Sequence, residues 1–178
     1  MHSSICSRVY LSCACLASSL APFSYCAYPL LVQDDYTYTT NEAGEASITG
    51  FNTSYSGNLS IKSTLGGCRV TTIGPEAFSN CLGLTSVTIP PSVIDIGEYT
   101  FRGCTSLTNA VIGNGVTWFD WSLFLGCTNL IHVSIGNGVT KLPYWKVDSP
   151  NLTSLTLGSQ ITDVKVLSSF SRLTSLTV

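Results

Sequence analysis

An internal repeat of 23 residues is the strongest constraint on this chain. Two copies lie end to end between Leu84 and Asn129 and read LTSVTIPPSVIDIGEYTFRGCTS and LTNAVIGNGVTWFDWSLFLGCTN. Five matched positions are shared by the two copies: Leu84 and Leu107, Ile89 and Ile112, Val93 and Val116, Phe101 and Phe124, Cys104 and Cys127. Repetition at a fixed period predicts identical small units that bury their apolar sides against one another.

The same register continues on both sides of these two copies, and every repeated position takes an apolar residue. The sets are Val70, Val93, Val116 and Val139; Ile73, Ile96, Phe119 and Leu142; Phe78, Phe101, Phe124 and Val147; and Leu84, Leu107 and Leu130, continued by Leu152 and Leu173. A period between about 20 and 29 residues is typical of leucine-rich solenoids. The fold class predicted is therefore an α/β leucine-rich-repeat solenoid, mostly β, coiled right-handedly around a parallel sheet.

Each unit divides into three segments. In the segment 84–89, Val87 and Ile89 are expected to point inward and Ser86 and Thr88 outward, because side chains alternate along a strand. Proline or glycine pairs then turn the chain, and a second short extended segment follows. Residues 98–104 are expected to form a short helical turn on the convex side, with Phe101 pointing into the core.

Three regions are expected along the chain. Residues 1–27 resemble a signal peptide, with Arg8 before the apolar run 9–20 and candidate cleavage sites after Ala21 or Ala27. The alternatives are a lipid anchor on a leader cysteine and a plain N-terminal extension. Residues 28–56 are expected to form an N-terminal β-hairpin cap with strands at 36–40 and 45–51. Residues 57–178 are expected to hold about five repeats, the last one incomplete.

The segment 73–93, IGPEAFSNCLGLTSVTIPPSV, resembles the BspA-type leucine-rich repeats. The opening YTTNEAGEASITGF resembles the module that precedes such repeats, and the likeness covers roughly residues 36–178. It weakens after Lys141, where Pro143, Lys146 and Pro150 depart from the pattern. The resemblance implies a secreted or surface-attached protein, from a bacterium or a parasitic protist, that adheres to or binds host proteins without catalysis.

The composition is unusually poor in charge. Asp, Glu, Lys and Arg make up 10% of the chain and the net charge is -2, while apolar residues make up 44%. An ordinary soluble domain has about 25% charged residues. The low charge favours an extracellular module and gives no basic patch for nucleic acid. No apolar run reaches the roughly 18 residues of a transmembrane helix.

Three cysteines, Cys81, Cys104 and Cys127, recur every 23 residues. This spacing places one thiol on each coil and predicts a buried column, with a disulfide between adjacent coils and a metal site as alternatives. Zinc motifs bring cysteines two to four residues apart, a spacing that is missing here. Cys68 lies in the longer connection and is expected to be a free thiol. No metal or cofactor is expected.

Polar side chains are expected in two columns on the concave face of the parallel sheet. The first column is Ser86, Asn109, His132, Ser154 and Ser175, and the second is Thr88, Val111, Ser134, Thr156 and Thr177. The ligand-contact candidates in these columns are Ser86, Asn109, His132 and Ser154, with Thr88, Ser134 and Thr156, because solenoids commonly bind through an extended concave surface. His132 has no second histidine in the repeats, and Asp95, Asp120 and Asp163 are singly placed, so the sequence does not indicate an enzyme.

Exposed aromatic residues are the second group of ligand-contact candidates. Trp118, Trp121 and Tyr144 fall at non-core positions of successive repeats, and Trp118 shares a column with Asp95 and Lys141. Trp and Tyr are enriched where protein interfaces are anchored, and they also stack on sugar rings. The alternative is that these rings pack over the outer turns and seal a coil weakened near Pro143.

These observations predict a secreted or cell-surface protein that acts as a protein-binding or adhesion module. The expected partner is a protein, such as a host extracellular-matrix or surface protein, with a glycan as a second class of ligand. The alternative is a structural spacer within a longer surface protein. An enzyme is disfavoured because the sequence shows no acid–base pair, no nucleophile–base pair and no phosphate-binding loop.

Overall fold

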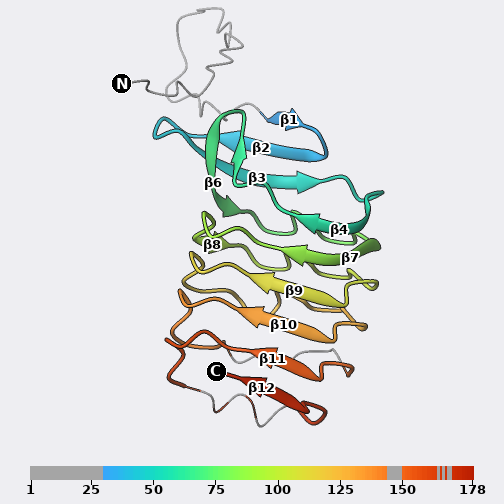
Figure 1. The fold of residues 1–178 in the computed structure, drawn as a ribbon. Helices are drawn as coiled ribbons and strands as arrows, with labels where there is room; N and C mark the ends of the chain where they lie inside the picture. The colour runs from blue at the N-terminus through green and yellow to red at the C-terminus, as the bar shows by residue number, and fades with distance from the viewer. Residues whose placement is uncertain (1–29, 144–149, 164, 166, 168–169) are drawn as a thin grey trace, which may run out of the picture.

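The computed structural model describes residues 30–143, 150–163, 165, 167 and 170–178. The expected leader at 1–27 lies outside this part of the chain, as do Tyr144 and Val147. Figure 1 shows a stack of coils that begins with β1 and ends with β12. The coils follow the sequence order, so each one contacts mainly the coil before it and the coil after it.

One side of every coil is a strand of a parallel sheet. Its strands, in spatial order, are β4 (Ser56–Ser60), β7 (Gly83–Thr88), β9 (Asn109–Ile112), β10 (His132–Ile135), β11 (Ser154–Thr156) and β12 (Ser175–Thr177). The pairing follows the repeat, with Ser86 opposite Asn109 and Asn109 opposite His132. The predicted parallel sheet and its register are confirmed.

A second sheet forms another side of the stack near its N-terminal end. It consists of β1 (Leu31–Gln33), β2 (Tyr36–Thr40), β3 (Glu45–Phe51), β5 (Thr64–Leu65), β6 (Cys68–Ile73) and β8 (Asp95–Ile96). Beyond β8 the column continues as two isolated parallel bridges, Asp95 to Trp118 and Lys141 to Asp163. This column is the second extended segment that the repeat predicts.

The core lies between these sides and is built of stacked columns. The rings of Phe78 and Phe101 are 5.2 Å apart and those of Phe101 and Phe124 are 5.7 Å apart, and both pairs are stacked. Leu84, Leu107 and the other repeated apolar residues are buried in the same way. The expectation that equivalent side chains lie one above the other is confirmed for the described residues.

The convex connections are tight turns rather than helices. Within residues 74–81 the amides of Ala77, Ser79 and Cys81 each donate to the carbonyl three residues earlier. Glu76 and Asn80, however, have φ values of 55° and 58°. Left-handed residues interrupt a right-handed helix, so no α-helix develops. Tyr99 repeats this geometry at 57°. Within the described residues helical geometry is confined to 3₁₀ positions at Lys165 and Leu167. The fold is mostly β, and the expected helical turns are not confirmed.

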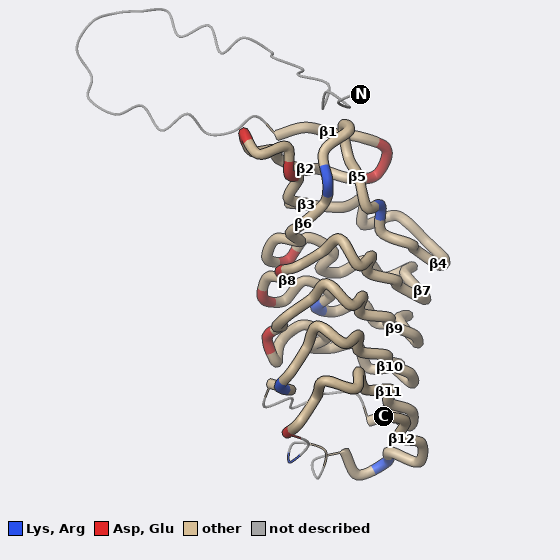
Figure 2. Tube along the Cα trace, turned by 60° about the vertical axis from the view of Figure 1, so that its left-hand side comes forward, with Lys and Arg blue, Asp and Glu red and all other residues tan. Residues whose placement is uncertain are grey.

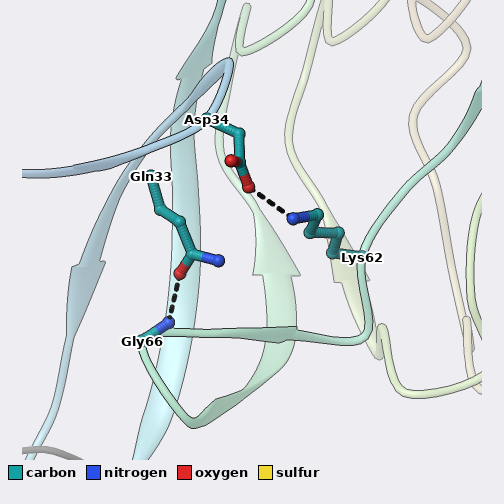
Figure 3. A network of polar contacts seen from close by, with 4 residues as sticks. All are labelled: Gln33, Asp34, Lys62 and Gly66. Atoms are coloured by element: carbon teal, nitrogen blue, oxygen red, sulfur yellow. Dashed lines mark hydrogen bonds and ion pairs between the residues drawn. The ribbon is translucent and has the colours of Figure 1, made fainter.

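The N-terminal strands join the stack through polar and aromatic contacts. The strands expected at 36–40 and 45–51 are present as β2 and β3, which pair antiparallel. Figure 3 shows the Gly66 amide donating to the Gln33 side-chain oxygen at 2.7 Å, beside an ion pair between Asp34 and Lys62. The Phe51 ring lies 4.9 Å from that of Phe78 and so extends the aromatic column into β3.

Candidate binding surfaces

The exposed face of the parallel sheet brings together most of the candidate residues. We call it the strand face and define it by the outward-facing side chains of the six strands. It holds Asn58, Ser86, Asn109, His132, Ser154 and Ser175 in one column and Ser60, Thr88, Val111, Ser134, Thr156 and Thr177 in the other. Because parallel strands in register point equivalent side chains the same way, the two predicted columns are confirmed.

The strand face is uncharged apart from the single imidazole. Strands β4, β7, β9, β10, β11 and β12 contain no Asp, Glu, Lys or Arg. Figure 2 shows the tube over β7, β9, β10 and β11 in tan, with acidic residues along the side that carries β8. Val111, 41% exposed, adds one apolar side chain near the middle. This face can exchange neutral hydrogen bonds with a ligand along its whole length.

His132 lies between Asn109 and Ser154 in its column. Neither neighbour is an acid or a second imidazole. Among the described residues no cluster of three or more His, Cys, Asp and Glu side chains is placed to hold a metal ion. The chemistry available at this face is therefore hydrogen bonding by hydroxyl, amide and imidazole groups.

Trp118 and Trp121 lie away from the strand face, with exposed fractions of 51% and 42%. The Trp121 ring packs edge-on against the Tyr99 ring, with 6.5 Å between the ring centroids. The guanidinium of Arg102 lies 5.6 Å from the centroid of the same Tyr99 ring. Trp118 instead pairs with Asp95 in the column that continues β8. The third aromatic candidate, Tyr144, lies outside the described residues.

The cysteine column is buried and reduced. Cys81, Cys104 and Cys127 form no disulfide bond and have no exposed surface. The Cys104 thiol donates to the Phe78 carbonyl at 3.1 Å, and the Cys127 thiol donates to the Phe101 carbonyl at the same distance. The core-column interpretation is thus supported over the two alternatives. Cys68 is disulfide-bonded, so the expectation of a free thiol there is wrong.

Two thiols of this column, Cys81 and Cys104, are disfavoured as thiolates. The hydrogen bond with Cys127, followed by burial, raises the pKa of Cys104 to about 12. The hydrogen bond with Cys104, followed by burial, also raises the pKa of Cys81. Since the thiolate is the reactive form of cysteine, the thiols of Cys81 and Cys104 are expected to have low reactivity.

The two acids that follow Asp95 in the repeats serve as turn residues. The Asp120 carboxylate accepts from the Ser122 amide at 2.8 Å, and the Asp163 carboxylate accepts from the Lys165 amide at 3.1 Å. Such bonds between a side chain and the backbone two residues later form Asx-turns. These carboxylates are therefore committed to local structure.

Comparison with known proteins identifies the family. The family described as BspA type leucine rich repeat region matches residues 51–177 in six copies. The chain belongs to this family. No curated protein shows a significant match. In the described residues, no helix is long and apolar enough to cross a membrane.

Solved structures share the fold of this BspA-type chain. A leucine rich cell surface protein from Faecalibacterium prausnitzii superposes with a TM-score of 0.67 at 22% identity, over 84% of this chain and 39% of the other. The Treponema pallidum leucine rich repeat protein gives 0.62 at 19% identity, over 84% and 82%. A Bacteroides capillosus leucine-rich repeat protein gives 0.64 at 26% identity, over 72% and 97%. This chain therefore spans well under half of the F. prausnitzii protein.

The 23-residue register does not predict the contact between Tyr99 and Trp121. The two residues are 22 positions apart, and the 23-residue register pairs Trp121 with Glu98 instead. The left-handed φ of Tyr99 redirects its side chain toward the next coil. A detectable signal was the pair of large aromatic residues, Tyr99 and Trp121, one position off the register on adjacent coils.

Proposed function

We propose that this BspA-type chain is a non-catalytic protein-binding module displayed outside the cell, and that the strand face is its contact surface. The observation that carries the proposal is the continuous, uncharged run of outward-facing side chains across six parallel strands. Family membership supports it, because repeat proteins commonly bind partners through such extended surfaces. The partner class that we favour is a host extracellular-matrix or surface protein.

The physical basis is many weak neutral contacts on a rigid scaffold. Serine and threonine side chains have a single rotatable bond to their hydroxyl, so ordering them on binding costs little entropy. The backbone beneath them is fixed by the parallel ladder, which leaves the surface largely pre-organised. Each hydroxyl can donate or accept, which suits the mixed polar surface of a folded protein.

The regional assignment is part of the same proposal. Residues 1–27 direct export and residues 28–56 close the N-terminal end of the stack formed by 57–178. The buried aromatic residues Tyr36 and Phe51, whose rings are 4.9 Å apart, support the closing role of the β2–β3 pair. Expression of the full chain in a secreting host and mass measurement of the released protein test the leader. Recovery of the full 178-residue mass would contradict removal of the leader.

The strand face is tested by substitution with charge. Immobilised chain is probed with purified fibronectin, fibrinogen, laminin and collagen, and any affinity is compared with that of a Ser86→Lys/Ser134→Lys/Thr156→Lys variant. Three long charged side chains across the sheet should reduce binding at least tenfold. A matched control places lysine at Thr105, Thr117 and Thr128, which are exposed elsewhere, and should retain binding within about twofold. Equal binding by the native chain, the strand-face variant and the control variant would favour the spacer hypothesis.

A further inference from the structure

A second surface, away from the strand face, exposes an acidic, an aromatic and a basic side chain that the strand-face proposal does not involve. Asp95, Trp118 and Lys141 occupy equivalent positions on three successive coils, and all three side chains are exposed. Asp95 and Trp118 are direct parallel partners, and Lys141 begins the next bridge of the same column. We call this set the Trp118 strip.

None of these side chains is engaged within the described part of the chain. The Asp95 carboxylate and the Lys141 ammonium form no hydrogen bond or ion pair with any described residue, and the Trp118 ring contacts no other described ring. Neighbouring strands are about 4.8 Å apart, so Asp95 and Lys141 lie about 10 Å from each other across Trp118. No ion pair joins them, so the column offers an acceptor on the coil before Trp118 and a donor on the coil after it.

Trp121 provides the internal contrast. It belongs to the same coil and has a similar exposed fraction, 42% against 51%. Its ring, however, packs against the Tyr99 ring, and the Arg102 guanidinium lies over that same ring. The Trp121 ring therefore packs within the stack, whereas the Trp118 ring has no aromatic partner among the described residues. About half of the Trp118 surface stays exposed and its ring stacks on no other described ring, so its face is open to a ligand that could also use the neighbouring Asp95 and Lys141.

We propose that the Trp118 strip binds a neutral hexopyranose unit of a glycan. The indole face would stack on the C–H face of the sugar ring, since the electron-rich ring attracts the weakly positive hydrogens. The Asp95 carboxylate would accept hydrogen bonds from ring hydroxyls on one side, and the Lys141 ammonium would donate to a hydroxyl on the other. This site is additional to the protein-binding role assigned to the strand face.

The chemistry disfavours the other classes of ligand. A cationic ligand would meet the Lys141 charge, and an anionic one, nucleic acid included, would meet the Asp95 charge and a chain of net charge -2. A protein hot spot is usually ringed by contacts that exclude water, whereas Trp118 is flanked by two charged groups that stay hydrated. A polyhydroxylated, uncharged ring satisfies both charges and the indole together.

The test uses native electrophoresis of the full chain in gels that contain soluble neutral polysaccharides: β-glucan, xylan, mannan or galactan. Calorimetry with a hexasaccharide of any retarding polymer gives the affinity. We expect retardation by at least one polymer, an affinity loss of tenfold or more for Trp118→Ala, and a loss of threefold or more for Asp95→Asn. The matched control, Trp121→Ala, should stay within twofold. Thermal unfolding of each variant verifies that it is folded, and Asp95→Asn serves where Trp118→Ala does not fold.

The outcomes separate this site from the strand face. The Ser86→Lys/Ser134→Lys/Thr156→Lys variant should lose protein binding yet keep glycan affinity within twofold. No retardation by any polymer, or equal losses for Trp118→Ala and Trp121→Ala, would overturn the proposal. Loss of glycan binding in the strand-face variant would also overturn it, because the glycan would then occupy the other surface.

Discussion

At the residue scale, the aromatic column concentrates the stability of several coils in a few side chains. Phe101 has no exposed surface and stacks on Phe78 and Phe124 at 5.2 and 5.7 Å. We expect Phe101→Ala to lower the free energy of unfolding by about 3–5 kcal/mol, because it removes buried area and leaves a cavity between two rings. Urea denaturation followed by circular dichroism measures the change. Thr88→Ala, on the exposed strand face, is the control, and an equal loss for both would contradict the stacking argument.

The cysteine column predicts a dependence of stability on alkaline pH. The pKa of Cys104 is raised from 9.0 to about 12 by its hydrogen bond with Cys127 and by burial. Above pH 9 the unfolded chain loses this proton while the folded chain keeps it, so ionisation favours unfolding. The contribution of Cys104 is complete below pH 9 and should fall by up to about 1.4 kcal/mol per pH unit between pH 9 and 12.

Variants isolate this dependence on Cys104. The free energy of unfolding is measured from pH 7 to pH 11 for the native chain and for Cys104→Ala, and the profile of the variant should be flatter above pH 9. Leu107→Ala, another buried residue of the same coil, destabilises without removing a thiol and should keep the native profile. Parallel profiles for the native chain and Cys104→Ala would show that this thiol does not titrate as expected.

Burial of single residues was predictable from the sequence because each repeated position meets the same neighbours. Val70, Val93, Val116 and Val139 are all fully buried, as their common register predicts. The contact of Tyr99 with Trp121 and the disulfide of Cys68 were not predictable in this way. The first depends on an aromatic side chain at a left-handed position, which Glu76 in the preceding coil does not supply, and the second lies in an irregular connection.

At the element scale, glycines fix how closely one coil approaches the next. A Cβ added to Gly113 would lie 2.6 Å from the Ile89 carbonyl oxygen and 2.7 Å from the Pro90 carbonyl carbon. Both contacts are with backbone, which cannot rotate away, so we expect Gly113→Ala to cost about 1–3 kcal/mol through overpacking. Thermal unfolding measures the loss. The control, Gly50→Ala, meets only Thr37 at 3.6 Å and should cost less, and the reverse order would contradict this account.

The elements themselves were only partly predictable. Strands followed from alternation and from the repeat, since a slip of one residue would turn every apolar side chain outward. The helical turns are not confirmed, because Glu76 and Tyr99 adopt positive φ, which non-glycine residues seldom do and which the sequence does not reveal. The longer connection is a hairpin of β5 and β6 turning at Gly66 and Gly67. Its Gly-Gly pair was a usable turn signal.

At the scale of the whole molecule, charge is segregated by surface. The strand face carries only His132 as an ionisable group. Asp95 lies in β8, Lys141 lies in the column of bridges that continues β8, and Glu98 and Asp120 lie on the connections. Figure 2 shows this division along the length of the stack. Composition predicted a weakly charged protein, but only the register of the strands shows that the strand face has no Asp, Glu, Lys or Arg side chain. The two proposed sites therefore differ in kind, one neutral and extended, the other local and charged.

This segregation predicts that binding through the strand face is insensitive to salt. Long-range steering needs net charge on the contact surface, and screening acts only on such charges. The affinity for any matrix protein captured by the native chain should change less than threefold between 50 and 500 mM NaCl, measured by calorimetry or surface plasmon resonance. A Val111→Lys variant, which places one charge in the middle of the face, should acquire a measurable salt dependence. A tenfold loss of affinity in the native chain over this range would place the contact on the charged connections instead.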